Sequence, residues 1–193
     1  GEWSARDATG NEIAAAPVAV LANAADALRL APGSDIALRR VRGQVSHLPA
    51  ALFRAPRLPL LRGGFVLPAV EGIAVAGASY DFDDEDPAPR LDGHAGNLAR
   101  LEGIVPGAAR ALDPALLEGR VGFRTVTRDR LPVAGELAPG LYGAFGYGSR
   151  GLVWAALAAE LIASLIEDEP LPLERPLADA LAPARFTRRG SRP

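Results

Sequence analysis

Cysteine, methionine and lysine are absent from this 193-residue chain, and histidine occurs only at His47 and His94. Without cysteine the chain forms no disulfide, holds no metal through a thiolate, and has no cysteine nucleophile. Two histidines are too few for a histidine-rich metal site, so we expect no bound metal. The missing methionine and the opening Gly1-Glu2-Trp3 lead us to expect a fragment of a longer protein.

Long hydrophobic runs and targeting signals are also lacking. No apolar run reaches the roughly 18 residues that a membrane span requires, and no signal peptide is visible. We therefore expect a cytoplasmic protein with no membrane partner. The formal net charge of −2 is unlike that of a globally basic nucleic-acid binder. Because 49% of the residues are hydrophobic, the chain can build one substantial core or two small ones.

The first half of the chain reads mainly as strands. Residues 18–22 form a continuous apolar run, which is typical of a strand buried on both faces. Turn residues and shorter runs predict the other elements, which are a turn at 7–11, a short helix at 24–30, a strand at 36–45 and a hairpin at 64–80 that turns at Glu71-Gly72.

The second half mixes helices and strands. Helical spacing predicts helices at 92–103, 106–117 and, most clearly, 151–166, where apolar residues form one stripe. Strands are predicted at 121–126 and 141–145, and a proline-rich and charged tail from residue 167 is expected to wrap the surface. The predicted fold is mixed, α/β overall and α+β within this chain. Residues 1–24 and 121–166 would form one domain, residues 25–120 a second domain, and residues 167–193 the tail.

Three charged patterns are open to more than one interpretation. Residues 81–86 are an acidic run that lacks the central glycine and terminal glutamate of a calcium loop, which favours a solvated loop. Arg39, Arg40 and Arg42 alternate along a strand and either contact phosphate or lie on a solvated edge. The basic tail either steers RNA or is simply solvated; its arginines are Arg185, Arg188, Arg189 and Arg192.

The clearest motif is Gly146-Tyr147-Gly148-Ser149-Arg150-Gly151, which matches G-x-G-x-x-G between a predicted strand and a predicted helix. A dinucleotide fingerprint also requires a following parallel strand that ends in an acid, but Glu167-Asp168-Glu169 leads into Pro170-Leu171-Pro172. A helix N-terminus that stabilises a planar anion, such as the N1–C2=O edge of a reduced flavin, is a second interpretation. A plain glycine turn between strand and helix is the third.

Several stretches of the chain resemble a known family. They are residues 119–135, which contain Gly122-Phe123-Arg124, residues 140–152, which contain the glycine motif, and residues 169–173 with 181–186. Together they resemble the FAD-dependent oxidoreductase domain of the bifunctional tRNA 5-methylaminomethyl-2-thiouridine biosynthesis enzymes. These enzymes are a branch of the D-amino-acid-oxidase-like family. Residues 41–44 and 77–81 match as well, so the resemblance runs through nearly the whole chain.

The resemblance implies a fold and a reaction. Members bind FAD non-covalently between a Rossmann-like domain and an antiparallel substrate domain. The tRNA-modifying members remove the carboxymethyl group from carboxymethylaminomethyl-uridine, or its 2-thio form, at the wobble position. The secondary amine becomes an imine, which hydrolyses to aminomethyl-uridine and glyoxylate. A separate upstream methyltransferase domain, not present in this chain, then uses S-adenosylmethionine.

The resemblance also assigns residues. Arg124 stands where the family arginine holds the substrate carboxylate, and Arg150 would add a second positive charge or else be a surface residue. The positions that match the cofactor-lining stretches are Ala22, Asn23, Gly146, Gly148, Ser149, Arg150, Gly151 and Leu152.

One departure from the family affects the expected activity. The family's own dinucleotide fingerprint lies upstream of Gly1, so we expect these 193 residues alone to be inactive and to bind FAD weakly or not at all. Two alternatives stay open for the function. One is a glycine, sarcosine or D-amino-acid oxidase acting on a free amino acid, and the other is a non-catalytic binding fragment.

Overall fold

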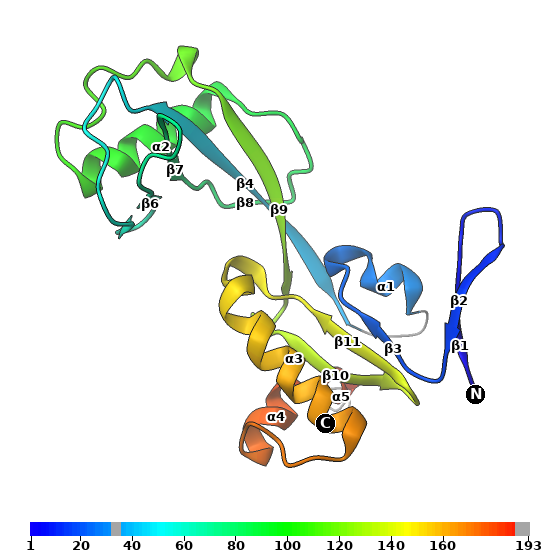
Figure 1. Ribbon diagram of the computed structural model, residues 1–193. Helices are drawn as coiled ribbons and strands as arrows, with labels where there is room; N and C mark the ends of the chain where they lie inside the picture. Colours follow the sequence, from blue (N-terminus) through cyan, green and yellow to red (C-terminus); the bar gives the residue numbers. More distant parts are fainter. Residues whose placement is uncertain (32–35, 188–193) are drawn as a thin grey trace, which may run out of the picture. The chain divides into compact units, whose positions relative to one another are not determined.

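The computed structural model describes residues 1–31 and 36–187. The chain divides into two compact units. Unit 1 is built from residues 1–39 and 124–193, and unit 2 from residues 40–123 (Figure 1). Residues 25–31, 36–39 and 167–187 are thus grouped with unit 1, whereas the predicted boundaries placed them in the middle domain and in a separate tail. The roles of the two units as FAD-binding and substrate domains stay predictions.

The central sheet of unit 1 has the strand order β10 (Val133–Ala138), β11 (Leu141–Phe145) and β3 (Ala19–Leu21). Strands β11 and β3 are parallel, with Leu141 opposite Ala19. The strands predicted at residues 18–22 and 141–145 therefore lie side by side in one sheet. The expectation of burial on both faces is wrong, because β3 is an edge strand of this sheet and Val20 is 45% exposed.

Helices cover both faces of this sheet. Helix α3 (Gly151–Glu167) packs on β10 and β11 through Ala158, Leu161 and Ile162, and α4 (Arg175–Leu181) adds Ala178 and Leu181 to the same core. The other face is covered by the 3-10 helix η1 (Ala24–Asp26), α1 (Ala27–Leu30) and α5 (Ala184–Thr187). Since Ala178 and Leu181 are buried, the C-terminal segment is part of the core and not merely a surface wrap.

An N-terminal hairpin precedes the sheet. Strands β1 (Trp3–Arg6) and β2 (Glu12–Ala16) are antiparallel, and their side chains are almost all exposed. The predicted turn between them is present, and the Asp7 carboxylate accepts hydrogen bonds from Thr9 and Asn11. These bonds, led by the one from the Thr9 hydroxyl, lower the pKa of Asp7 to about 2.

The helix of unit 1 that follows the glycine motif is rich in apolar residues. Together with the preceding turn, residues Gly148–Glu167 are long and apolar enough to cross a membrane by length and composition alone. The stretch is not a continuous apolar run, because it contains Arg150 and Glu160. A core helix passes the same test, and α3 buries one side against the sheet.

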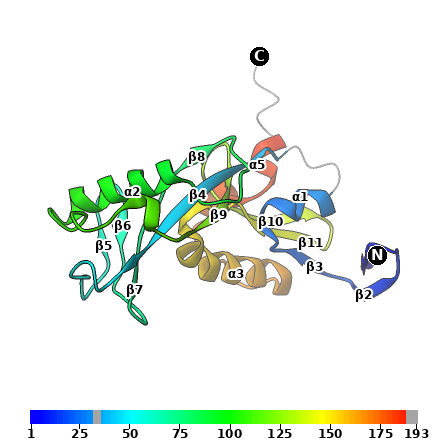
Figure 2. The same ribbon diagram turned by 90° about the horizontal axis from the view of Figure 1, so that it is seen from above.

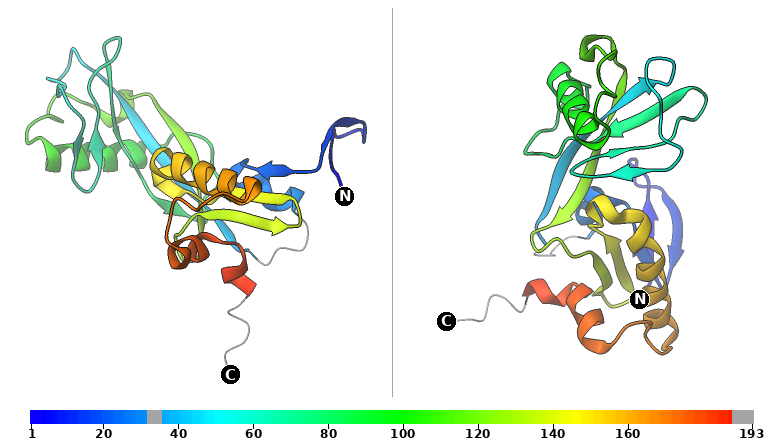
Figure 3. Two further views of the ribbon diagram at one scale, coloured as in Figure 1. Left: turned by 60° about the horizontal axis from the view of Figure 1, so that its bottom comes forward. Right: turned by 90° about the vertical axis from the view of Figure 1, so that its left-hand side faces the viewer.

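Unit 2 is an antiparallel sheet with one helix along it. The strand order is β5 (Leu60–Leu61), β6 (Phe65–Val66), β7 (Ile73–Gly77), β4 (Leu38–Pro49) and β8 (Asp81–Phe82), with β9 (Gly119–Thr127) also beside β4. Helix α2 (Leu91–Ile104) runs along one face, as Figures 2 and 3 show. The core between them contains Leu48, Val66, Ala74, Ala76, Leu98, Leu101 and Leu112. The predicted hairpin at 64–80 and helix at 92–103 are confirmed.

The predicted helix at 106–117 is wrong. This segment consists of turns and the short 3-10 helix η2 (Pro114–Leu116). Pro106 disfavours continued helix at the residue before it, and helix α2 indeed ends at Ile104. The Glu102 carboxylate then accepts hydrogen bonds from the Gly107 and Ala109 amides, which fixes the chain in a turn.

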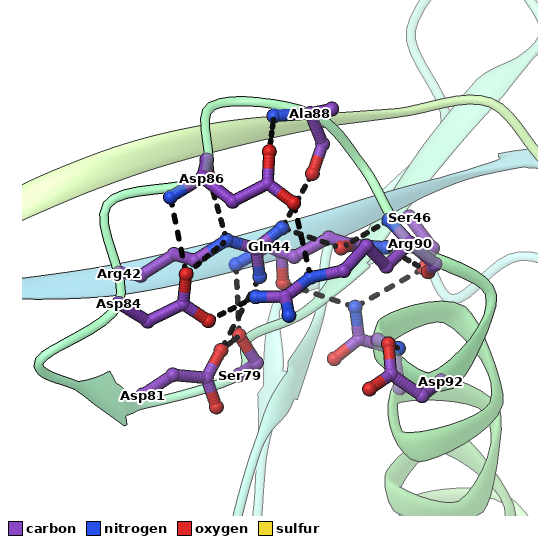
Figure 4. A network of polar contacts seen from close by, with 12 residues as sticks. Arg42, Gln44, Ser46, Ser79, Asp81, Asp84, Asp86, Ala88, Arg90 and Asp92 are labelled. Atoms are coloured by element: carbon purple, nitrogen blue, oxygen red, sulfur yellow. Dashed lines mark hydrogen bonds and ion pairs between the residues drawn. The ribbon is translucent and has the colours of Figure 1, made fainter.

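Charged residues that were expected to be solvated form a buried network in unit 2 (Figure 4). Arg42 is only 1% exposed; its guanidinium donates to the Asp86 carbonyl at 2.8 Å and lies 3.3 Å from the Asp81 carboxylate. Arg90 donates to the Asp84 carboxylate, and this bond, followed by one from the Asp86 amide, lowers the pKa of Asp84. The interpretation of Arg42 as an edge residue is therefore wrong. The loop of residues 81–86 is only partly solvated, because Asp83 and Glu85 are exposed while the Asp84 side chain is 23% exposed.

Candidate cofactor site

The carboxyl ends of β3 and β11 meet at one edge of the sheet in unit 1, because the two strands are parallel. Ala22 and Asn23 follow β3 directly, and the glycine turn of residues 146–151 follows β11. In open sheets with parallel strands, ligands bind outside this edge. Two of the sequence-predicted cofactor segments, far apart in the chain, are thus brought to neighbouring strand ends.

The turn after β3 exposes its polar residue. Ala22 and Asn23 are exposed, and the Asn23 side chain makes no capping hydrogen bond to the short helix that it precedes. Ala24 has a φ of 54°, so the backbone reverses sharply immediately after Asn23. The Asn23 amide group is therefore presented at the strand end and is not used to start the helix.

The turn after β11 needs glycine at two positions. Gly146 has φ 77° and Gly148 has φ 58°, which are backbone conformations that residues other than glycine rarely adopt. A Cβ added to Gly146 would lie 3.1 Å from the Thr127 methyl group, and one added to Gly148 would lie 3.1 Å from a Val126 methyl group. Gly151 is different, since its φ is −54° and the nearest contact of an added Cβ would be at 3.9 Å.

The glycine turn leads into an uncapped helix. A 3-10 turn (Gly148–Arg150) precedes α3, and the N-cap residue Arg150 makes no side-chain capping bond. The first turn of α3 contains no acidic residue. The first amides of this 17-residue helix are therefore left to other partners, and the helix dipole makes this end electropositive. Ser149 and Arg150 are exposed, and Leu152 is 97% exposed.

Arg124 approaches this turn along β9. Val126 forms an antiparallel bridge with Tyr147, in the middle of the glycine motif. Arg124 is two residues earlier on the same face of β9, roughly 6–7 Å along the strand. It is half-buried. The strand that carries the proposed carboxylate-binding arginine thus ends against the glycine turn.

A buried ion pair, which the sequence did not reveal, braces β9 near this turn. The Asp129 carboxylate lies 2.9 Å from the Arg185 guanidinium and also accepts hydrogen bonds from the Thr127 hydroxyl and the Leu131 amide. Burial by itself would raise the pKa of Asp129, but the bonds from Arg185, Leu131 and Thr127 outweigh it and lower that pKa to about 2.

The same pair corrects one interpretation of the basic tail. Arg185 was expected to be solvated or to steer RNA, yet its side chain is only 12% exposed and is bound to Asp129. The available signal was the Thr-x-Asp turn after a strand, which offers a carboxylate for a distant cation. Arg188, Arg189 and Arg192 lie outside the described residues.

An apolar groove of about 500 Å³ runs beside the carboxyl end of β3. It is lined by Val20 and Ala22 on one side and by Tyr147 and the alanine-rich face of α3 on the other. Burial raises the pKa of the Tyr147 phenol, which stays protonated at neutral pH. Sequence reasoning did not single out Tyr147, because a residue between two glycines gives no sign of its long-range contacts.

Metal ligands are not clustered at this site. Across residues 1–31 and 36–187, no group of three or more histidine, cysteine, aspartate or glutamate side chains is arranged to hold a metal ion.

Comparison with known proteins identifies the family. The model of the family described as FAD dependent oxidoreductase matches residues 1–165. The chain belongs to this family. Among curated relatives, the tRNA 5-methylaminomethyl-2-thiouridine biosynthesis bifunctional proteins MnmC of Burkholderia mallei (strain SAVP1) and Burkholderia pseudomallei (strain 668) are each 50% identical over 216 residues. The match covers 100% of this chain but only 33% of either relative.

Solved structures of the family share the fold. Glycine oxidase from Geobacillus kaustophilus matches with a TM-score of 0.72 and 25% identity, over 89% of this chain and 46% of that chain. Amadoriase I from Aspergillus fumigatus matches with a TM-score of 0.69 and 18% identity, over 96% of this chain and 47% of that chain. The predicted mixed fold of the D-amino-acid-oxidase-like family is confirmed by these matches.

Proposed function

We propose that this chain is the C-terminal part of an FAD-dependent enzyme that oxidises a secondary amine on tRNA. The supporting observation is the 50% identity to the MnmC proteins over the whole chain, within a family of FAD-dependent oxidoreductases. The substrate would be carboxymethylaminomethyl-uridine, or its 2-thio form, at the wobble position. The protein would act in the cytoplasm, and a methyltransferase domain elsewhere in the longer protein would use S-adenosylmethionine.

The uncapped N-terminus of α3 fits the flavin ring. Its free amides and positive dipole end suit a planar group that gains negative charge at N1 and C2=O, and no acidic residue in the first turn opposes that charge. In this proposal residues 146–152 hold the ring edge, while Ala22 and Asn23 approach it from the neighbouring strand end. FAD, when bound, would supply an acceptor for a hydride, which is two electrons and one proton.

Arg124 would orient the substrate. A guanidinium pairs with a carboxylate through two parallel hydrogen bonds, which fixes both the position and the rotation of the carboxymethyl group. The C–H bond beside the neutral amine breaks, a C=N bond forms, and water then adds before the C–N bond breaks to release glyoxylate. Arg150 would add positive charge near the carboxylate. The first step depends more on orientation than on a strong base, so neither histidine is required.

Residues outside this chain would complete the flavin domain. Val20 on the edge strand β3 is exposed, and the apolar groove beside it is lined by Ala155, Ala159 and Ile162 of α3. The curated relatives are about three times as long as the matched part. We propose that upstream residues of the longer protein cover this edge and supply the phosphate-binding loop, so that residues 1–193 alone bind FAD weakly.

Glyoxylate release tests this function. The protein as its gene encodes it would be mixed with tRNA that carries carboxymethylaminomethyl-uridine, and glyoxylate and the modified nucleoside would be quantified. We expect one glyoxylate for each aminomethyl-uridine formed. Glycine and sarcosine serve as comparison substrates, because the fold match to a glycine oxidase favours a free amino acid as the second candidate. Rapid oxidation of either amino acid without reaction on tRNA would reject the tRNA proposal.

A further inference from the structure

Residues 36–70 contain six arginines and no aspartate or glutamate, in a chain whose net charge is −2. Three of the arginines have partners. Arg42 is buried in the network of unit 2, Arg40 lies 3.7 Å from the Glu85 carboxylate and over the Phe123 ring, and Arg39 also interacts. Positive charge is therefore concentrated in this stretch of the sequence, and only part of it is neutralised within the chain.

The other three arginines define a basic surface, which consists of Arg54, Arg57 and Arg62. All three are exposed, and none of their side chains forms an ion pair within the described residues. Arg6 and Arg29 are also exposed but differ in this respect, since Arg6 pairs with Glu12 and Arg29 with Asp26. The basic surface thus presents three guanidinium groups whose hydrogen-bond donors are available to an outside partner.

The loop that carries Arg54 and Arg57 is anchored. Phe53 and Ala55 pack against the core beneath α2, so the exposed Arg54 lies between two inward-facing residues. Pro56 stands immediately before Arg57, and proline restricts both its own φ and the residue before it. The loop is therefore held in place by apolar packing and not by acidic partners. Because its backbone is already anchored, less conformational entropy would be lost when the loop binds a ligand.

Arg62 is presented by a tight hairpin at the sheet edge. It follows β5 directly, and its amide donates to the Gly64 carbonyl at 2.9 Å. Gly64 lies against the sheet so closely that an added Cβ would be 2.8 Å from the Gly77 carbonyl oxygen and 3.0 Å from the Arg100 side chain. The strands β5, β6 and β7 lie beside one another in Figure 2, which places this hairpin at the end of the sheet order.

We propose that this basic surface binds the phosphate backbone of RNA. The inference rests on the proposed function, because a tRNA substrate requires a contact surface larger than one wobble nucleotide. The planar guanidinium group of arginine matches two phosphate oxygens, and an arginine without a carboxylate partner does not have to break an ion pair before it binds phosphate. Leu58 and Leu61, which are 72% and 75% exposed, lie between the arginines and would contact sugars or bases.

Salt-dependent binding tests this inference on the protein as its gene encodes it. The probe is a fluorescein-labelled tRNA with an unmodified wobble uridine, titrated by anisotropy at several salt concentrations. In the triple variant Arg54→Gln/Arg57→Gln/Arg62→Gln we expect the Kd to rise at least about tenfold at 0.1 M salt. The slope of log Kd against log salt should fall by about 2, since each lost phosphate contact removes roughly 0.7–1.

A charge-matched control separates this surface from net charge. The variant Arg29→Gln/Arg110→Gln/Arg175→Gln removes three exposed arginines elsewhere, and it should change the Kd less than about twofold. Flavin content and melting temperature should match the wild type in both variants. Equal losses in the two variants, or no loss in the first, would overturn the inference.

Two further outcomes distinguish this inference from the proposed function. If the wild type releases glyoxylate from tRNA and the first triple variant binds tRNA normally, only the basic surface is wrong. If tRNA binding depends on these arginines but glyoxylate is never released, only the proposed reaction is wrong. Loss of binding to phosphatidylserine vesicles with tRNA binding unchanged would assign the surface to a membrane and overturn the inference.

Discussion

Removal of the Asp129 charge should destabilise unit 1 in a pH-dependent way. The pKa of Asp129 falls from its ordinary 3.8 to about 2 in the folded protein, and its side chain is only 17% exposed. Since a tenfold change in acid dissociation is about 1.4 kcal/mol, the charged form stabilises the fold by about 2 kcal/mol at pH 7. Asp129→Asn should lose this amount, which lowers the melting temperature by about 4–8 °C for a domain of this size.

The pH dependence follows from the direction of the pKa change. Because the folded pKa is lowered, the stabilisation is complete above about pH 4 and is lost as the pH falls toward 2. The difference between wild type and Asp129→Asn should therefore shrink to roughly half at pH 3. Thermal unfolding of residues 1–193, followed by tryptophan fluorescence, measures it in unit 1, which contains both Trp3 and Trp154.

A surface pair provides the control for this experiment. Asp26→Asn removes a carboxylate whose pair with Arg29 is exposed, so it should shift the melting temperature by less than about 1 °C. A difference between Asp129→Asn and wild type that is equally large at pH 3 and pH 7 would refute the electrostatic explanation. A melting temperature of Asp129→Asn that equals the wild-type value at pH 7 would show that the Asp129–Arg185 pair does not stabilise unit 1.

Three other predictions concern the cofactor site. Gly148→Ala places a side chain at a residue with φ 58° and against Val126, so it should cost about 1–2 kcal/mol of stability and lower the flavin-to-protein absorbance ratio. The control variant Gly151→Ala should retain the normal flavin content. Arg124→Lys should reduce kcat/KM for glyoxylate release at least about tenfold at normal flavin content, because a charge-assisted hydrogen bond contributes about 1.5–3 kcal/mol; wild-type kinetics in Arg124→Ala would reject this role. Residues 1–193 purified alone should show far less than one flavin per chain, and a stoichiometric yellow protein would contradict that expectation.

The sequence predicted the elements that local chemistry determines. Turn residues located the reversals at 7–11 and 71–72, and the apolar stripe located α3. The strands at residues 18–22 and 141–145 were predicted from their apolar runs and placed in one domain, and β3 and β11 are indeed paired. The glycine turn was predicted as well, since its spacing between strand and helix limits the possible conformations.

Contacts between distant residues were not predictable in the same way. Arg42 resembles any strand arginine in sequence, and only the folded loop of residues 81–90 surrounds it with carboxylates and carbonyls. The pairing of Arg185 with Asp129 joins residues 56 positions apart. The failed helix at 106–117 shows the opposite error, because helical spacing was given more weight than Pro106 and the acceptor at Glu102.

The discontinuity of unit 1 has a consequence for how this protein can be changed. Unit 2 is inserted as one uninterrupted segment, and its first and last residues meet, with the Arg40 guanidinium 4.3 Å from the centre of the Phe123 ring. Segments whose ends are adjacent tolerate exchange, because the host chain needs no new path. Residues 40–123 therefore form a segment that can be exchanged as a whole, and chimaeras between family members would test whether this segment determines which amine is recognised.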